Sequence, residues 1–121
     1  MLAREYPETV IDDVLVELRQ HGLQSDRRFT ESFVHVREQR GCGPLRIRAE
    51  LRERGVAVEL IDEFVDVNAL SWGERLAVVR RKRFGNDYPR DYRERARQAR
   101  FLRHRGFTTE QIRDELKASG A

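Results

Sequence analysis

The chain has 121 residues, of which 39% are hydrophobic and 37% are charged, and its formal net charge is +3. This length allows one domain, or a few repeats that share one continuous core. There is no apolar run long enough to span a membrane and no signal-peptide pattern at the start of the chain. A single cysteine, Cys42, excludes an internal disulfide. We therefore expect a cytoplasmic protein rather than a membrane-spanning or disulfide-stabilised one.

The spacing of apolar residues predicts helices and no convincing strand. A first helix is predicted over residues 7–21. A second runs to about Gln39, with Ser25 and Asp26 available as its cap and with Phe29 on its apolar face.

Two glycine-marked turns separate the next helices. Residues 41–44 end the second helix, and Pro44 suits the first position of the third, where its missing N–H costs nothing. Gly55 ends the third helix, because glycine readily takes the left-handed conformation, and the apolar Val56 follows it. A fourth helix is predicted from about Ala57.

Three capping boxes predict the starts of the last three helices, which we expect to end near residues 84, 105 and 118. The paired residues are Ser71 with Glu74, Asp91 with Glu94, and Thr108 with Gln111. In the run of four cations at residues 80–83, we expect the aliphatic stem of Arg83 to pack rather than to contact a partner.

A three-helix pattern recurs with a spacing of 51 residues. Arg54-Gly55-Val56 is matched by Arg105-Gly106-Phe107, Ile61 and Val65 are matched by Ile112 and Leu116, and Tyr6, Ile11 and Leu15 give a weaker third match. A fixed period in this range predicts an all-α array of tandem helical repeats in one continuous domain.

The predicted repeats have the following boundaries. Residues 1–24 would be the third helix of an incomplete first repeat, residues 25–69 the second repeat and residues 70–121 the third. The chain thus starts in the middle of a repeat, which indicates a missing N-terminal segment or a late start codon.

The charges are segregated along the chain. Residues 80–105 contain eleven Arg or Lys against three acids, a net charge of +8, whereas residues 56–66 contain four acids and no base. The candidate binding residues form a basic stripe: Arg93, Arg97, Arg100 and His104 on one helix, Arg46, Arg48 and Arg52 on another, and Arg75 with Lys82 on a third. Such ridges can bind a polyanion or an acidic protein surface, or they can be a solvated face neutralised by Glu50 and Glu94.

The sequence offers no catalytic constellation. His21, His35 and His104 are scattered and lack a metal-ligand spacing, and Cys42 lies in a turn with no assignable base. We expect a protein that is not an enzyme and that uses no metal or cofactor.

The ordered motifs identify the sequence as resembling the RecX family of bacterial regulators of the RecA recombinase. The residues that carry the resemblance are Asp26-x-x-Phe29-x-x-Ser32-Phe33, Arg40-Gly41-Cys42-Gly43-Pro44-x-Arg46-Ile47, Leu51-x-x-x-Gly55-Val56, Trp72, Lys82-x-Phe84-Gly85, and Phe101-Leu102-x-x-Arg105-Gly106-Phe107. They extend over nearly the whole chain.

The resemblance implies three tandem three-helix repeats in an elongated, curved monomer. It also implies that this monomer binds along the helical groove of the RecA filament on single-stranded DNA. It implies limits on filament growth, ATP hydrolysis, strand exchange and co-protease action, in recombination, DNA repair and the SOS response. We expect the basic stripe to contact the filament, together with a weak direct contact to DNA. The alternative from the residues themselves is a helical module that binds nucleic acid directly.

Overall fold

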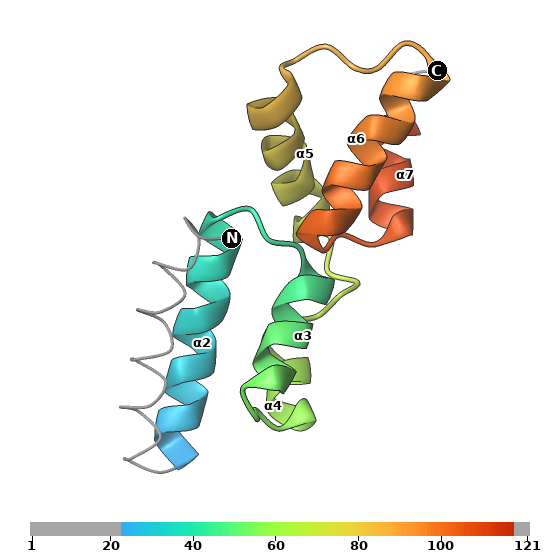
Figure 1. Cartoon of the computed structure of the whole chain (residues 1–121). Coiled ribbons are helices and arrows are strands. Elements are labelled where there is room, and N and C mark those ends of the chain that lie inside the picture. The colour runs from blue at the N-terminus through green and yellow to red at the C-terminus, as the bar shows by residue number, and fades with distance from the viewer. Residues whose placement is uncertain (1–22, 118–121) are drawn as a thin grey trace.

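The structure is a computed structural model that describes residues 23–117, and all secondary structure within that range is helical. Its helices are α2 (Leu23–Gln39), α3 (Pro44–Glu53), α4 (Val58–Phe64), α5 (Ser71–Phe84), α6 (Tyr92–Arg105) and α7 (Thr109–Lys117) (Figure 1). The all-α prediction is confirmed over this range. The helix predicted over residues 7–21, and with it the proposed first repeat, lies outside the described residues.

The helices form two units of three. The more extensive helix contacts lie among α2, α3 and α4 in one unit and among α5, α6 and α7 in the other. Figure 1 shows the two units in separate halves of the molecule, with the α6–α7 end against α3. Buried side chains from both units form one hydrophobic core: Phe29, Phe33, Val34, Cys42, Ile47, Leu51, Val56, Ile61, Val65, Trp72, Leu76, Leu102, Phe107, Ile112 and Leu116.

The two units repeat the same turn between their second and third helices. Gly55 and Gly106 take φ values of +84° and +108°, in the left-handed region that favours glycine. The next residue's N–H donates to the carbonyl of Leu51 in one unit, at 3.1 Å, and of Leu102 in the other, at 3.2 Å. The apolar positions that follow are buried in both units: Val56, Ile61 and Val65, and Phe107, Ile112 and Leu116. The predicted correspondence of these positions is confirmed.

One of the three predicted capping boxes is complete, and a second is half formed. At α7, Thr108 and Gln111 exchange hydrogen bonds, with the Gln111 N–H donating to Thr108 Oγ1 at 3.0 Å and the Thr108 N–H donating to Gln111 Oε1 at 2.9 Å. At α6, the Asp91 carboxylate accepts from the Glu94 N–H at 2.8 Å. The Glu94 carboxylate binds Arg97 instead of completing the box.

The expected box at Ser71 and Glu74 is wrong. The residue before α5 is Leu70, which is already helical in φ and ψ and provides no side-chain cap. The Trp72 N–H donates to the Ala69 carbonyl at 3.2 Å, so backbone turns satisfy the first donors of this helix.

The expected cap at Ser25 and Asp26 is also wrong, because α2 already includes Leu23. Asp26 lies in the helix, where its carbonyl accepts a hydrogen bond from Thr30 Oγ1 at 2.8 Å.

The two units join where the end of α6 meets the start of α3. The Gly43 N–H donates to the Arg105 carbonyl at 2.8 Å, and the Leu45 N–H donates to the Gly106 carbonyl at 2.9 Å. Pro44 lies between these two donors and has no N–H to satisfy. Unpaired carbonyls at one helix end thus meet unpaired N–H groups at another, an arrangement that the helix dipoles also favour.

This junction leaves no room for a side chain at Gly43. A Cβ there would lie 2.4 Å from the Gly106 carbonyl carbon and 2.5 Å from the Phe107 nitrogen. A Cβ at Gly106 would lie 2.4 Å from Arg46 Cβ. The backbones of the two units therefore touch directly.

A buried arginine anchors the 85–91 loop to α7. The Arg80 side chain is fully buried; its Nε lies 3.3 Å from the Glu115 carboxylate and its Nη1 donates to the Asp87 carbonyl at 3.2 Å. Its guanidinium carbon lies 4.0 Å from the centre of the Tyr88 ring. Arg83 of the same cationic run is exposed, but its guanidinium carbon lies 5.2 Å from the centre of the Phe101 ring and 5.8 Å from that of Phe84, so it packs against these rings.

Candidate interaction surface

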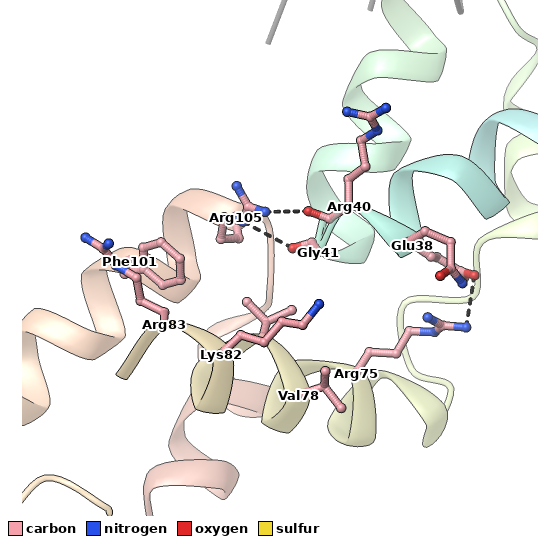
Figure 2. Close-up of a pocket in the computed structure, with 11 residues that line it drawn as sticks. Glu38, Arg40, Gly41, Arg75, Val78, Lys82, Arg83, Phe101 and Arg105 are labelled. Atoms are coloured by element: carbon pink, nitrogen blue, oxygen red, sulfur yellow. Dashed lines mark hydrogen bonds and ion pairs between the residues drawn. The ribbon is translucent and has the colours of Figure 1, made fainter. Parts of the chain in front are cut away.

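A cleft of about 330 Å³ opens where the end of α2 faces α5 and the end of α6 (Figure 2). Its charged lining residues are the cations Arg40, Arg75, Lys82, Arg83 and Arg105 and the acid Glu38. Two of them, Arg75 and Lys82, belong to the predicted basic stripe. Sequence analysis did not place Arg40 and Arg105 here, because Arg40 follows α2 and Arg105 ends α6, far apart in the sequence. Arg83 lies beside Lys82 on α5 and was expected to pack through its stem instead.

Several of these cations hold the cleft together. Arg105 Nε donates to the Gly41 carbonyl at 3.2 Å, and its Nη2 donates to the Arg40 carbonyl. Arg75 Nη2 lies 3.3 Å from a Glu38 carboxylate oxygen and joins α5 to α2. Figure 2 shows both connections across the cleft. These arginines satisfy helix-end carbonyls and an acid of the other unit, so their first role is structural.

Lys82 differs from these arginines because its head group is free to bind a partner. Its side chain is exposed on α5 and makes no ion pair within residues 23–117. Figure 2 shows it projecting over the cleft between Arg75 and Arg105.

The stripe on α6 is exposed as the helical spacing predicts. Arg93, Arg97, Arg100 and His104 all have exposed side chains. Arg97 donates from Nε and Nη2 to both Glu94 carboxylate oxygens, each at 2.9 Å, and its guanidinium carbon lies 4.9 Å from the centre of the Phe84 ring. Arg97 is therefore partly neutralised and held in place.

The electrostatics at Glu94 follow from this arrangement. Hydrogen bonds from the Arg97 guanidinium and the Gln98 amide lower the pKa of the Glu94 carboxyl from 4.5 to about 2. The same ion pair raises the pKa of Arg97. The Arg97–Glu94 pair thus stays charged at neutral pH and reduces the net charge of the α6 stripe.

The α3 members of the stripe are mostly occupied. Arg48 Nη2 lies 2.7 Å from an Asp62 carboxylate oxygen, and its Nη1 donates to the Val65 carbonyl at 3.2 Å, so it ties α3 to the end of α4. Arg46 Nε lies 3.2 Å from Glu50. Arg52 is exposed and makes no ion pair with the part of the chain that the structure describes.

The site residues therefore fall into two groups. Arg46, Arg48, Arg75 and Arg97 are engaged with acids of the same molecule, whereas Arg52, Lys82, Arg93, Arg100 and His104 are exposed and have no such partner among residues 23–117. The second group presents cationic or titratable groups that a partner can reach without first breaking an internal ion pair.

No helix within residues 23–117 is long and apolar enough to cross a bilayer. In the same range, no three His, Cys, Asp or Glu side chains are grouped so that they could hold a metal ion.

Comparison with known proteins gives consistent matches. Residues 25–64 match the second three-helix domain of RecX, and residues 74–116 match its third three-helix domain. Regulatory protein RecX of Halorhodospira halophila is 47% identical over 109 residues, which are 90% of this chain and 68% of that protein. Regulatory protein RecX of Pseudomonas entomophila is 40% identical over 109 residues, 90% of this chain and 70% of that protein.

A third relative extends the match along the chain. Regulatory protein RecX of Pseudomonas fluorescens is 39% identical over 117 residues, which are 97% of this chain and 76% of that protein. These matches include the Arg54-Gly55 and Arg105-Gly106 turns and both sides of the junction between the two units. The chain therefore belongs to the RecX family of regulatory proteins.

Proposed function

We propose that this protein is a non-enzymatic regulator of the RecA recombinase in homologous recombination and DNA repair. It binds the RecA filament on single-stranded DNA and limits filament growth, ATP hydrolysis, strand exchange and co-protease action. Membership of the RecX family is the observation that carries this proposal. The protein acts in the cytoplasm as a monomer.

The exposed cations give this proposal a contact surface. The α6 stripe from Arg93 to His104 spans eleven helical steps, or about 16 Å. Arg93 and Arg100 make no ion pair within residues 23–117, so they can pair with acids or phosphates of the filament. Exposed cations of this kind also accelerate encounter with a negatively charged partner.

The α6 stripe is tested by reversing its charge. The variant Arg93→Glu, Arg97→Glu, Arg100→Glu should weaken inhibition of RecA filament growth on single-stranded DNA, followed by light scattering, by at least about tenfold. The matched control reverses three exposed cations outside the stripe, as Arg28→Glu, Arg81→Glu, Arg90→Glu. It changes the net charge equally and should inhibit within about twofold of the unmodified protein.

Circular dichroism at 222 nm is used as the control that both variants keep their helices. Unchanged inhibition by the helical α6 variant would remove this stripe from the contact surface. Equal loss in both variants would show that net charge, rather than the stripe, controls inhibition.

A second function, direct binding of nucleic acid by the helical units, is favoured by the same exposed cations. It predicts tight binding of labelled single-stranded DNA without recombinase, with an affinity that falls steeply as salt rises. The regulator proposal predicts that this direct binding is weak. Fluorescence anisotropy with DNA alone separates the two functions.

A further inference from the structure

A second groove, of about 530 Å³, lies between α6 and α7 and shares no lining residue with the cleft described above. Its cationic lining residues are Arg95, Arg100, Arg103, Arg113 and Lys117, and no acid lines it within residues 23–117. All five of these side chains are exposed. The groove therefore collects five positive charges without internal compensation.

The floor of this groove is apolar. Ala96 and Ala99 of α6 line it together with Ile112 and Leu116 of α7, which are buried behind them. Both alanines are partly exposed, and their short side chains keep the floor low between the long cationic side chains on either rim. The groove thus combines an apolar channel with a basic border.

The basic border is a local feature of one side of α7. The other side of α7 forms part of a separate groove in which Glu110, Asp114 and Glu115 are the charged residues. Opposite charges are therefore sorted to opposite sides of one nine-residue helix. Five like charges gathered on one side repel one another, and an acidic partner would relieve that repulsion on binding.

We propose that the α6–α7 groove binds an amphipathic helix of a partner protein whose apolar stripe is bordered by Asp and Glu. From Tyr92 to Arg103 the groove extends about 16 Å, the length of three turns of helix. Apolar residues at i, i+3 or i+4, and i+7 of the bound helix would lie over Ala96 and Ala99, and its acids would meet the rim. The groove shares Arg100 with the α6 stripe, but this proposal does not rest on binding to the recombinase.

The shape and chemistry of the groove favour a protein helix over a nucleic acid strand. Single-stranded nucleic acid is bound through successive aromatic rings on which bases stack, together with cations along the backbone. Tyr92 is the one aromatic ring among the described lining residues, and it lies at one end of the groove, because it is the first residue of α6. An apolar floor matches the apolar face of a helix, whereas a phosphate backbone offers nothing to cover it.

The test uses the full chain and three labelled helical peptides of equal length in fluorescence anisotropy. The first has leucine at i, i+3, i+4 and i+7 with glutamate on both borders. The second replaces each glutamate by lysine, and the third keeps the glutamates but replaces each leucine by serine. The first peptide should bind, and the other two should bind at least about tenfold more weakly. The second peptide has lost the acids that pair with the rim cations, and the third has lost the apolar stripe that covers the floor.

The site is located with protein variants that leave the α6 stripe intact. Arg103→Ala with Arg113→Ala removes two rim cations, and the matched control is Arg81→Ala with Arg90→Ala, two exposed cations outside the groove. The rim variant should weaken binding of the first peptide by about 5- to 10-fold, and the control should change it by less than about twofold. Inhibition of the recombinase is measured separately on the same variants.

Three outcomes would overturn the proposal. Equal binding of all three peptides would show that the groove does not recognise a helix with an apolar stripe bordered by acids. Tight binding of a 20-nucleotide single strand that the rim variant abolishes would assign the groove to nucleic acid. Self-association in sedimentation experiments that the rim variant abolishes would assign it to another copy of this chain.

Discussion

Replacing Gly43 by alanine tests the junction between the two units at its tightest point. Gly43 has φ of −88°, a value that alanine adopts without strain, so the effect of the change is steric. The new Cβ would lie 2.4 Å from the Gly106 carbonyl carbon, where about 3.4 Å is an ordinary contact. The two backbones must therefore separate by about 1 Å.

Separation by that distance weakens both hydrogen bonds of the junction. The donor–acceptor distances of both bonds would exceed the normal range. These distances are now 2.8 Å from the Gly43 N–H to the Arg105 carbonyl and 2.9 Å from the Leu45 N–H to the Gly106 carbonyl. Each is worth about 1 kcal/mol, and overpacking adds about 1–3 kcal/mol. We expect Gly43→Ala to lower the free energy of unfolding by about 3 kcal/mol, and hence Tm by about 15 °C.

Gly73→Ala is the matched control. Gly73 lies in α5, and a Cβ there meets nothing within 4 Å. The control should raise stability by about 0.5–1 kcal/mol, because glycine is a poor helix residue. Urea unfolding followed by circular dichroism gives both values. A Gly43→Ala protein within about 0.5 kcal/mol of the unmodified protein would refute the direct backbone contact between the units.

Three further changes address other parts of the fold. Glu115→Ala leaves the Arg80 guanidinium buried without its carboxylate partner, so it should lower the free energy of unfolding by about 3 kcal/mol. Arg80→Met removes the buried charge itself and should lower the free energy of unfolding by only about 1 kcal/mol. Equal losses of the two variants in urea unfolding would contradict this reasoning. The pKa of Glu94 falls from 4.5 to about 2 on folding, so the stability that its pair with Arg97 provides is present above pH 4.5 and is lost as the pH falls toward 2. Glu94→Gln should remove that part of the pH dependence of stability, measured by acid titration followed by circular dichroism. Burial raises the pKa of the Cys42 thiol. In the folded protein this thiol should therefore react with a thiol reagent at pH 8 at least ~10-fold more slowly than in urea. Equal rates in the two conditions would place Cys42 at the surface.

The features that sequence analysis predicted are those that depend on residues close together in the chain. The turns at Gly55 and Gly106 require a left-handed residue with an apolar residue after it, and both parts of that pattern are visible in four or five residues. The box of Thr108 with Gln111 is equally local. The box at Ser71 failed because the preceding backbone was already helical and left its side chain no capping role.

The features that sequence analysis missed depend on contacts between segments that are distant in the sequence. Arg80 is buried because Glu115, 35 residues later, lies within reach of it, and nothing in the run at residues 80–83 distinguishes it. The occupied members of the basic stripe have the same explanation. Arg48 binds Asp62 and Arg75 binds the other unit, and helical spacing alone identifies exposed faces without identifying the acids that face them.

The most direct test of the regulator proposal is ATP hydrolysis by RecA on single-stranded DNA as this protein is titrated in. The proposal predicts that hydrolysis falls progressively with added protein. It also predicts that Gly43→Ala, which disturbs the relative position of the two units, inhibits less than Gly73→Ala at the same concentration. Hydrolysis that stays constant over a titration with protein shown to be helical by circular dichroism would contradict the account.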